Sequence, residues 1–269
     1  MTTSESGASA AIRNRRAIVT GASSGIGAAA ARALRASGWD VVGVARRADR
    51  LEALVAETGA DVFAADLTAQ ADVDALVAHL AATGGVDALV HVAGGARGAD
   101  RVEDGDTDDW TWMYDVNVLS AQRLVKALMP QLRERIRSGA THADTLFVTS
   151  TAAQVAYPGG GGYNAAKAAE AMLVHALRQE LNGEPIRVIE VAPGMVHTPE
   201  FSLNRLGDAA RADALYDGVD HPLVAEDVAD VIAYALNAPG HVNLDLITLR
   251  PVAQSAQHLL HRGTLKPRD

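Results

Sequence analysis

The sequence RAIVTGASSGIGAAAARAL, residues 16–34, decides the fold of this chain. Residues 16–20 are a short apolar, β-branched run that predicts a buried strand, and an alanine-rich helix begins near Ile26. Glycines between them let the backbone approach a pyrophosphate, while the helix N-terminus supplies free N–H groups and a positive dipole end. A plain glycine-rich turn, or a methyltransferase loop for another nucleotide, would have similar glycines. The residues expected to contact phosphate are Gly21, Ser23, Ser24, Gly25, Ile26 and Gly27, and the serines can alternatively cap the helix.

The same alternation of strand and helix continues along the chain. Apolar runs occur at residues 16–20, 40–45, 60–65, 86–92, 145–150, 186–191 and 244–249. Alanine-rich stretches with helical spacing separate them, which indicates parallel pairing with both sheet faces covered. We therefore expect one α/β domain over residues 1–269: a doubly wound, seven-stranded parallel Rossmann sheet with right-handed crossovers. Residues 1–13 and 263–269 are predicted to be loose termini.

Composition excludes several classes of function. The 269 residues carry a net charge of −9, which argues against a nucleic-acid-binding surface. The absence of cysteine rules out disulfides, thiolate metal sites and cysteine nucleophiles, and fits an intracellular, cytoplasmic location. No apolar run approaches the length of a membrane span, so we expect a soluble protein. The histidines show no paired ligand spacing, so no metal site is predicted.

The ends of the next strands indicate a dinucleotide. An NAD site would place an acidic residue at the end of the second strand, where this chain has Ala45 followed by Arg46 and Arg47. Guanidinium groups there can bind the 2′-phosphate of NADP, although two solvated arginines at a helix start are common. Asp66 and Leu67 end the third strand, where they can meet an adenine ring or cap the following helix. Small residues, Ala93 and Gly94, end the fourth strand and leave room for a cofactor.

Tyr163 and Lys167 carry the predicted chemistry. They are one helical turn apart and share a face, roughly 6 Å apart along the axis. A free tyrosine has a pKa near 10, and a neighbouring ammonium favours the phenolate. Ser150, delivered by the fifth strand, can then hydrogen-bond a substrate carbonyl while Tyr163 donates a proton. The glycines at 159–162 either turn the chain sharply so that Tyr163 faces the pocket or form a flexible surface loop.

With these motifs in place, the chain resembles the short-chain dehydrogenase/reductase (SDR) family over nearly its whole length. The resemblance rests on TGASSGIG (20–27), Asp66-Leu67, Ala93-Gly94, Asn117 in YDVNVLS, Ser150, YNAAK (163–167) and PGMVHT (193–198). It implies an Asn117-Ser150-Tyr163-Lys167 tetrad, with Tyr163 as general acid/base. Lys167 would bind the nicotinamide ribose and lower the pKa of Tyr163, Ser150 would polarise the carbonyl, and Asn117 would support a proton-conducting water. It also implies that Pro193, Gly194, Met195, Val196 and Thr198 cover the nicotinamide.

One segment departs from the family pattern. The family commonly has Asn-Asn-Ala-Gly after the fourth strand, and this chain has His91-Val92-Ala93-Gly94. We expect His91 to be a core histidine with satisfied hydrogen bonds. Asn117 could alternatively satisfy the backbone at a kink in a long helix from about 108 to 136.

The substrate is the least determined feature. Residues 195–224 are expected to form a lid, and two segments resemble the branch of NADP-dependent serine and 3-hydroxy acid dehydrogenases, as well as clavaldehyde-type reductases. Arg205 is the candidate for gripping a substrate carboxylate, against the alternative of an exposed arginine without a ligand. The other expected substrate contacts are Ser150, Tyr157, Tyr163, Met195 and Phe201. Alternatives are a broad reductase for apolar ketones or aldehydes with Leu203 as a further wall residue, a non-catalytic NADP-sensing regulator, or an epimerase, which would require a longer carboxyl-terminal domain.

Assembly is predicted from the resemblance. The helices near 108–136 and 162–182 would pair across twofold axes to build homodimers and homotetramers. Their candidate contact residues are Val118, Leu124, Leu128, Met172, Leu173 and Leu177, although some must face the sheet.

Overall fold

A doubly wound parallel sheet organises the protein, as predicted. The computed structural model describes residues 14–267. The main sheet has seven strands in the order β3-β2-β1-β4-β5-β6-β9, and every neighbouring pair is parallel. The strands are β1 (Arg16–Thr20), β2 (Asp40–Ala45), β3 (Asp61–Ala64), β4 (Ala88–His91), β5 (Ala143–Val148), β6 (Ile186–Pro193) and β9 (Leu246–Leu249).

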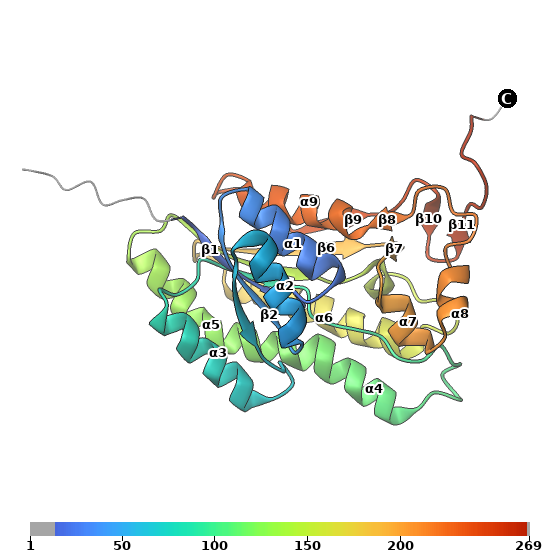
Figure 1. Cartoon of the computed structure of the whole chain (residues 1–269), viewed down its shortest axis with the longest axis horizontal. Helices are drawn as coiled ribbons and strands as arrows, with labels where there is room; N and C mark the ends of the chain where they lie inside the picture. The colour runs from blue at the N-terminus through green and yellow to red at the C-terminus, as the bar shows by residue number, and fades with distance from the viewer. Residues whose placement is uncertain (1–13, 268–269) are drawn as a thin grey trace, which may run out of the picture.

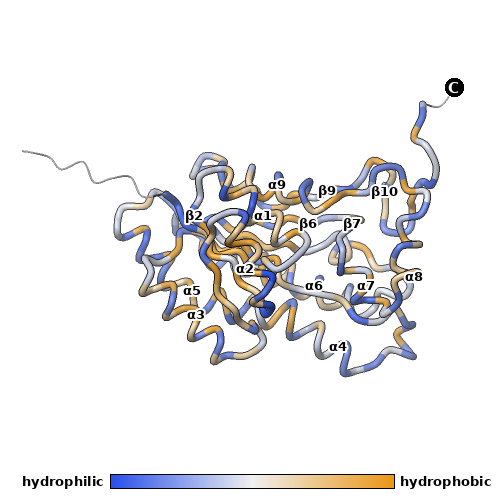
Figure 2. Tube along the Cα trace, viewed as in Figure 1, coloured by the Kyte–Doolittle hydropathy of each residue, from blue (hydrophilic) through white to orange (hydrophobic). Residues whose placement is uncertain are grey.

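Helices cover both faces of this sheet (Figure 1). One face packs against α1 (Gly25–Ala36), α2 (Ala48–Thr58) and α9 (Ala225–Asn237). The other face packs against α3 (Gln70–Ala82), α5 (Ser120–Arg137) and α6 (Gly161–Glu180). The strands are predominantly apolar because β1, β2, β4, β5 and β6 each place side chains in both cores. In β1, Ala17 and Val19 belong to one buried cluster and Ile18 to the other. Figure 2 shows the resulting concentration of apolar residues along the sheet.

The predicted long helix over 108–136 is interrupted. The segment consists of α4 (Thr107–Tyr114), a π-helical turn (Asp115–Leu119) and α5. A π turn inserts one residue into the helical repeat and is frequent at functional sites. Here it contains Asn117, which is completely buried.

Smaller elements surround the carboxyl edge of the sheet. The predicted lid, residues 195–224, contains β7 (Val196–His197), α7 (Phe201–Leu206), α8 (Ala209–Ala214) and β8 (Leu223–Val224). The chain then ends in a small hairpin of β10 (Gln254–Ala256) and β11 (Leu259–Leu260). Of the two predicted loose termini, residues 1–13 lie outside the described residues. Residues 263–267 contact the lid, where Leu265 N donates to Asp220 Oδ2 over 2.9 Å.

The described part of the chain, residues 14–267, contains no helix with the length and hydropathy of a membrane span.

Candidate active site

A cavity of about 760 Å³ lies at the carboxyl ends of β1 to β6. This is where ligands bind in doubly wound sheets. The structure brings every predicted site residue to its wall except Asn117, which lies behind it. The wall includes Gly21, Ser23, Ser24, Gly25, Ile26, Gly27, Arg46, Arg47, Asp66, Leu67, Ala93, Gly94, Ser150, Tyr157, Tyr163, Lys167, Pro193, Gly194, Met195, Val196, Thr198, Phe201 and Arg205.

The glycine turn after β1 is too tight for larger residues. Gly21 has a φ of 68°, and a Cβ on Gly27 would lie 2.3 Å from the Gly21 carbonyl oxygen. The turn leads directly into the first residues of α1, whose N–H groups lack intrahelical partners. This backbone fits the expected phosphate cradle of a dinucleotide cofactor.

Arg47 shows how an anion is held beside this turn. Its guanidinium makes a bidentate contact with the Glu200 carboxylate at 2.7 and 2.9 Å, and it donates to the hydroxyls of Ser23 and Ser24. Ser24 donates to the same carboxylate over 2.8 Å. The two serine hydroxyls therefore hydrogen-bond within this cluster, and the Ser24 side chain does not cap α1. A carboxylate bound this way demonstrates that the donor set accepts an anion.

Asp66 and Arg46 lie further along the same wall. Asp66 Oδ1 accepts from the backbone and hydroxyl of Thr68, at 3.0 and 2.7 Å, and α3 begins only at Gln70. The alternative that Asp66 caps that helix is therefore wrong, because the N-cap position belongs to Ala69. Arg46 is exposed at the rim of the cavity.

Tyr163, Lys167 and Ser150 meet at the inner end of the cavity. Lys167 Nζ donates to the Val148 carbonyl over 3.1 Å and to Glu170 over 2.7 Å. Ser150 Oγ accepts from Ala152 N over 3.0 Å, which fixes the hydroxyl two residues beyond β5. Burial raises the pKa of Tyr163 above its usual value, although the Lys167 charge and a Ser150 hydrogen bond both lower it. The expected direction of the lysine effect is therefore present, but in the protein alone desolvation outweighs it.

The four glycines before Tyr163 are closely packed. A Cβ on Gly159 would lie 2.7 Å from the Ala99 carbonyl oxygen, and one on Gly162 would lie 2.5 Å from Met113 Cε. Glycine is required because the start of α6 presses against α4 and the segment after β4. The alternative of a flexible surface loop is wrong, and the sharp turn places Tyr163 against the cavity.

Asn117 links the π turn to the strand β4. Its Nδ2 donates to the carbonyls of Gly95 and Met113, at 2.9 and 2.7 Å, and its Oδ1 accepts from Gly95 N. A Cβ on Gly94 would lie 2.5 Å from Asn117 Oδ1 and 3.4 Å from Lys167 Nζ. Asn117 thus satisfies the helix backbone, which is one of the two interpretations, and its Oδ1 and Lys167 Nζ both lie close to Gly94. The support of a proton-conducting water, which the resemblance implies, stays a prediction.

His91 is a core histidine, as predicted. It is fully buried, and burial together with the Lys167 charge lowers its pKa to about 3, so the ring is neutral. Thr20 Oγ1 already accepts from Val92 N and Ala93 N, so its proton is directed to His91 Nδ1 at 3.2 Å. Nε2 then donates to Ser120 Oγ at 3.4 Å. His91 therefore braces the strand end that leads to Ala93 and Gly94.

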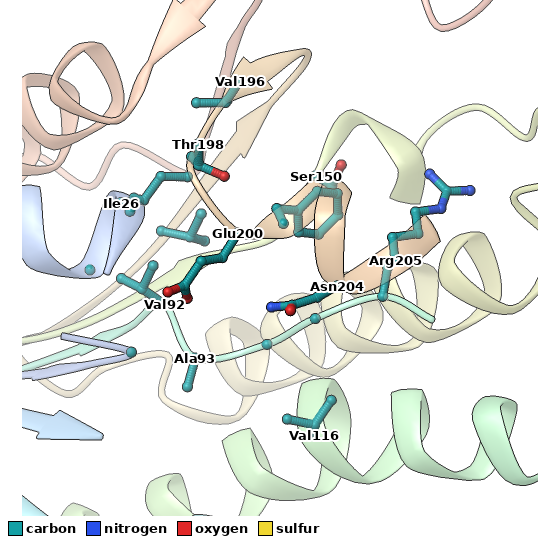
Figure 3. A pocket seen from close by; sticks show the side chains of 18 of the residues that line it. Ile26, Val92, Ala93, Val116, Ser150, Val196, Thr198, Glu200, Asn204 and Arg205 are labelled. Atoms are coloured by element: carbon teal, nitrogen blue, oxygen red, sulfur yellow. The ribbon is translucent and has the colours of Figure 1, made fainter. Parts of the chain in front are cut away.

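The lid forms the outer wall of the cavity. In Figure 3, Glu200 and Asn204 extend into the cavity, and Arg205 is turned away from Glu200. The Arg205 guanidinium lies 5.9 Å from the Tyr163 ring centroid and donates to Tyr157 Oη over 3.0 Å and to the Gly159 carbonyl over 2.7 Å. Phe201 packs edge-on against Tyr163 at 5.5 Å. Leu203, by contrast, points outward and is 40% exposed, so it is no wall residue.

Two carboxylates were missed by sequence reasoning. Glu200 had no recognisable signal within the mixed composition of the lid. Glu170 had one, because it follows Lys167 by three residues and so falls on the buried face of α6. No group of three or more histidine or carboxylate side chains within residues 14–267 could hold a metal ion.

Comparison with known proteins identifies the family. Residues 15–206 match the family model for short chain dehydrogenases. The chain belongs to this family. It is 53% identical over 247 residues to an uncharacterised oxidoreductase of Mycobacterium tuberculosis, which covers 91% of this chain and 94% of that protein. It is 37% identical over 242 residues to a serine 3-dehydrogenase of Agrobacterium fabrum, covering 88% and 94% of the two chains.

The solved structures agree with this assignment. The closed form of a serine dehydrogenase complexed with NADP⁺ superposes with a TM-score of 0.84 and 31% identity, covering 94% of this chain and all of that one. This short-chain dehydrogenase is therefore an NAD(P)-dependent oxidoreductase that acts on CH–OH groups, and its relatives include the serine dehydrogenase branch.

Proposed function

We propose that the protein is an NADP-dependent dehydrogenase that interconverts a small 3-hydroxy acid and the matching semialdehyde. The observation that carries the proposal is the position of Arg205, whose guanidinium lies beside both Tyr157 and Tyr163. A carboxylate there would meet planar donors while the alcohol hydroxyl approaches the tyrosine hydroxyl. The serine dehydrogenase relatives support a small acidic substrate.

In the proposed mechanism, the chain's own residues handle the proton while the nicotinamide supplies or accepts the hydride. Tyr163 Oη takes the proton from the substrate hydroxyl during oxidation and returns it during reduction. Ser150 orients the carbonyl oxygen, and its hydroxyl is fixed by the Ala152 amide. Lys167 favours the phenolate through its charge, and both Asn117 Oδ1 and Lys167 Nζ lie close to Gly94. Tyr163 and Lys167 are both buried and line the cavity, so a bound substrate would meet them in a largely desolvated site.

The preference for NADP rests on Arg46 and Arg47. Both line the cavity next to the glycine turn, and no carboxylate ends β2, where Ala45 stands. Arg47 already grips an anion, and the NADP⁺ complex of the serine dehydrogenase supports the same cofactor for this chain.

Replacing Arg205 tests the substrate class. Arg205→Ala is expected to raise KM for an acidic substrate roughly ten- to a hundredfold, because a charge-assisted contact is lost. A neutral aldehyde should be reduced with nearly unchanged KM. Steady-state kinetics on serine, 3-hydroxypropionate and 3-hydroxyisobutyrate, with neutral aldehydes as reference, measure both effects.

The matched control is Arg211→Ala, since Arg211 belongs to the same lid but does not line the cavity. Arg205→Lys keeps the charge without the planar fork and should fall between wild type and alanine. If all three acids fail while neutral ketones turn over, the hydroxy-acid proposal is wrong.

The alternative, a broad reductase for apolar carbonyl compounds, is favoured by Phe201, Met195 and Trp112 on the cavity wall. A non-catalytic regulator would show no turnover on either panel.

We also propose that the protein is cytoplasmic and forms homodimers or homotetramers. Leu124, Leu128 and Leu177 are buried against the sheet, and Val118 is also buried, so none of the four is available for such contacts. Met172 is 64% exposed on α6, and Tyr114 at the end of α4 and Leu119 at the end of the π turn are also exposed. A twofold pairing of these helices would cover all three.

Sedimentation velocity at micromolar concentration is expected to give a dimer or tetramer. Met172→Glu should shift the distribution toward smaller species, because it places a charge in the proposed contact. A wild-type monomer under these conditions would refute the assembly proposal.

A further inference from the structure

Glu170 is a buried carboxyl group in direct contact with Lys167. Its side chain is fully buried, and Oε2 lies 2.7 Å from Lys167 Nζ. Its second oxygen, Oε1, is buried without a hydrogen-bond partner among the described residues. Buried carboxylates are costly unless paired, so an unpartnered oxygen beside the active-site lysine requires a reason.

A second buried carboxyl group lies in the same region. Glu190 on β6 is 1% exposed, accepts from Thr149 Oγ1 over 2.7 Å, and lies 3.0 Å from His175 Nε2. His175 is on α6, two turns beyond Lys167, and its side chain is 40% exposed. Glu190 therefore acts on the charge of Glu170 from inside the protein, and His175 connects Glu190 with the surface.

The charges near Lys167 come from several elements. Tyr163, Lys167, Glu170 and His175 lie on α6, Glu190 lies on β6, His91 on β4, and Tyr157 before α6. Lys167 directly favours a Tyr163 phenolate, and Glu170 is its hydrogen-bonded counter-ion. A second cation, the Arg205 guanidinium of α7, lies 5.9 Å from the Tyr163 ring centroid. An anion at the position of Glu170 opposes the lysine, because like charges disfavour ionisation of the tyrosine.

We propose that Glu170 is a positioning residue that fixes Lys167 Nζ against the Val148 carbonyl and, through its own charge, sets the pH range in which Tyr163 can act as a base. This inference rests on the proposed acid/base role of Tyr163 and Lys167. The Lys167 ammonium donates two of its three protons, to the Val148 carbonyl and to Glu170. The third proton is left for another acceptor.

The pKa shifts of Glu170 and Lys167 agree with this role. Burial raises the pKa of Glu170 to about 7, against the Lys167 charge that lowers it, and Glu190 raises it further. Burial lowers the pKa of Lys167, but Glu170 and Tyr163 outweigh that effect, so the lysine stays charged. Below about pH 7 Glu170 is neutral, and Lys167 lowers the pKa of Tyr163 without an opposing negative charge. Above that pH Glu170 is an anion and raises the pKa of Tyr163.

The test measures the Tyr163 pKa directly. The protein has five tyrosines, so carbon-13 labelling at Cζ gives a small set of resonances, and Tyr163 is assigned by its loss in Tyr163→Phe. Titration of the NADP⁺ complex is compared between wild type, Glu170→Gln and Glu170→Leu. Both variants lack the carboxylate, whereas only glutamine keeps an acceptor for Lys167. The control is Glu180→Gln, the same substitution at an exposed position of α6.

Both Glu170 variants are expected to lower the Tyr163 pKa by about one unit, and Glu180→Gln to leave it unchanged. The acid limb of kcat/KM for alcohol oxidation should move to lower pH by the same amount, because oxidation requires the deprotonated tyrosine. Glu170→Leu should additionally lose kcat, since Lys167 is no longer held.

A Tyr163 pKa that is unchanged or raised in both variants would overturn the inference, even if their melting temperatures fall, because a purely structural role would lower stability alone. The resonance titration does not depend on turnover. If the wild type oxidises no alcohol, the proposed function fails while the effect of Glu170 on Tyr163 is still decided.

Discussion

The variant Tyr163→Phe is expected to retain at most a few per cent of wild-type kcat. General acid/base groups contribute roughly a hundred- to ten-thousandfold, and phenylalanine removes the proton donor while preserving the ring. The ring packs edge-on against Phe201, so the cavity wall should survive the substitution. Turnover is followed by NADPH absorbance with the best substrate from the aldehyde panel.

Binding of NADPH serves as the control, because the hydroxyl is not part of the glycine turn or the arginine cluster. The dissociation constant for NADPH, measured by fluorescence titration, should change less than threefold or so. A Tyr163→Phe variant with more than a few per cent of wild-type kcat would show that another group carries the proton. Lys167→Ala should impair both turnover and cofactor affinity, and an effect on one alone would contradict its double role.

NADP is expected to bind roughly ten- to a hundredfold more tightly than NAD. The reason is the 2′-phosphate, which can form charge-assisted hydrogen bonds worth about 1.5–3 kcal/mol with a guanidinium. Arg46 is exposed at the rim of the cavity and is the expected partner. Arg46→Ala should therefore weaken NADP binding and leave NAD binding nearly unchanged. Calorimetric titration of both cofactors measures the ratio.

Arg50→Ala is the matched control, because Arg50 is an exposed arginine at the start of α2, close to Arg46 in the sequence, that does not line the cavity. Removal of either arginine makes the net charge of the protein more negative by the same amount, so only a specific contact distinguishes the two variants. Equal affinity of the wild type for NADP and NAD, or unchanged discrimination in Arg46→Ala, would exclude this account of cofactor choice.

The sheet could be predicted from sequence because its signals are local. The strands are predominantly apolar, and β1 shows why: Ala17 and Val19 enter one core and Ile18 the other. The strand order and the positions of Ser150, Tyr163 and Lys167 then follow from the rules of parallel sheets. A kink at Asn117 is one interpretation of the sequence, but the π turn over Asp115–Leu119 could not be predicted, because a π turn leaves no distinctive pattern in the sequence.

The pKa of Tyr163 was harder to predict from the sequence than the position of its side chain. The spacing of Tyr163 and Lys167 indicated that the lysine lowers the tyrosine pKa, which is correct for that pair alone. The net effect depends on burial and on Glu170, and both depend on how α6 packs against β5 and β6. Similarly, the contact between Glu200 and Arg47 joins residues 153 positions apart, so local patterns could not reveal it.

The Glu200 contact has a consequence for cofactor entry. Arg47 carries an internal counter-ion, so a phosphate that binds this face of the guanidinium exchanges with a carboxylate of the protein rather than with salt ions from solvent. The affinity of the protein for that phosphate should accordingly depend less steeply on ionic strength than the affinity of a site with two unpaired arginines. Glu200 immediately precedes α7, which carries Phe201 and Arg205. A phosphate that displaces the carboxylate would therefore free Glu200, the residue directly before α7. Cofactor binding at Arg47 would then be thermodynamically linked to the position of Phe201 and Arg205 in the substrate part of the cavity.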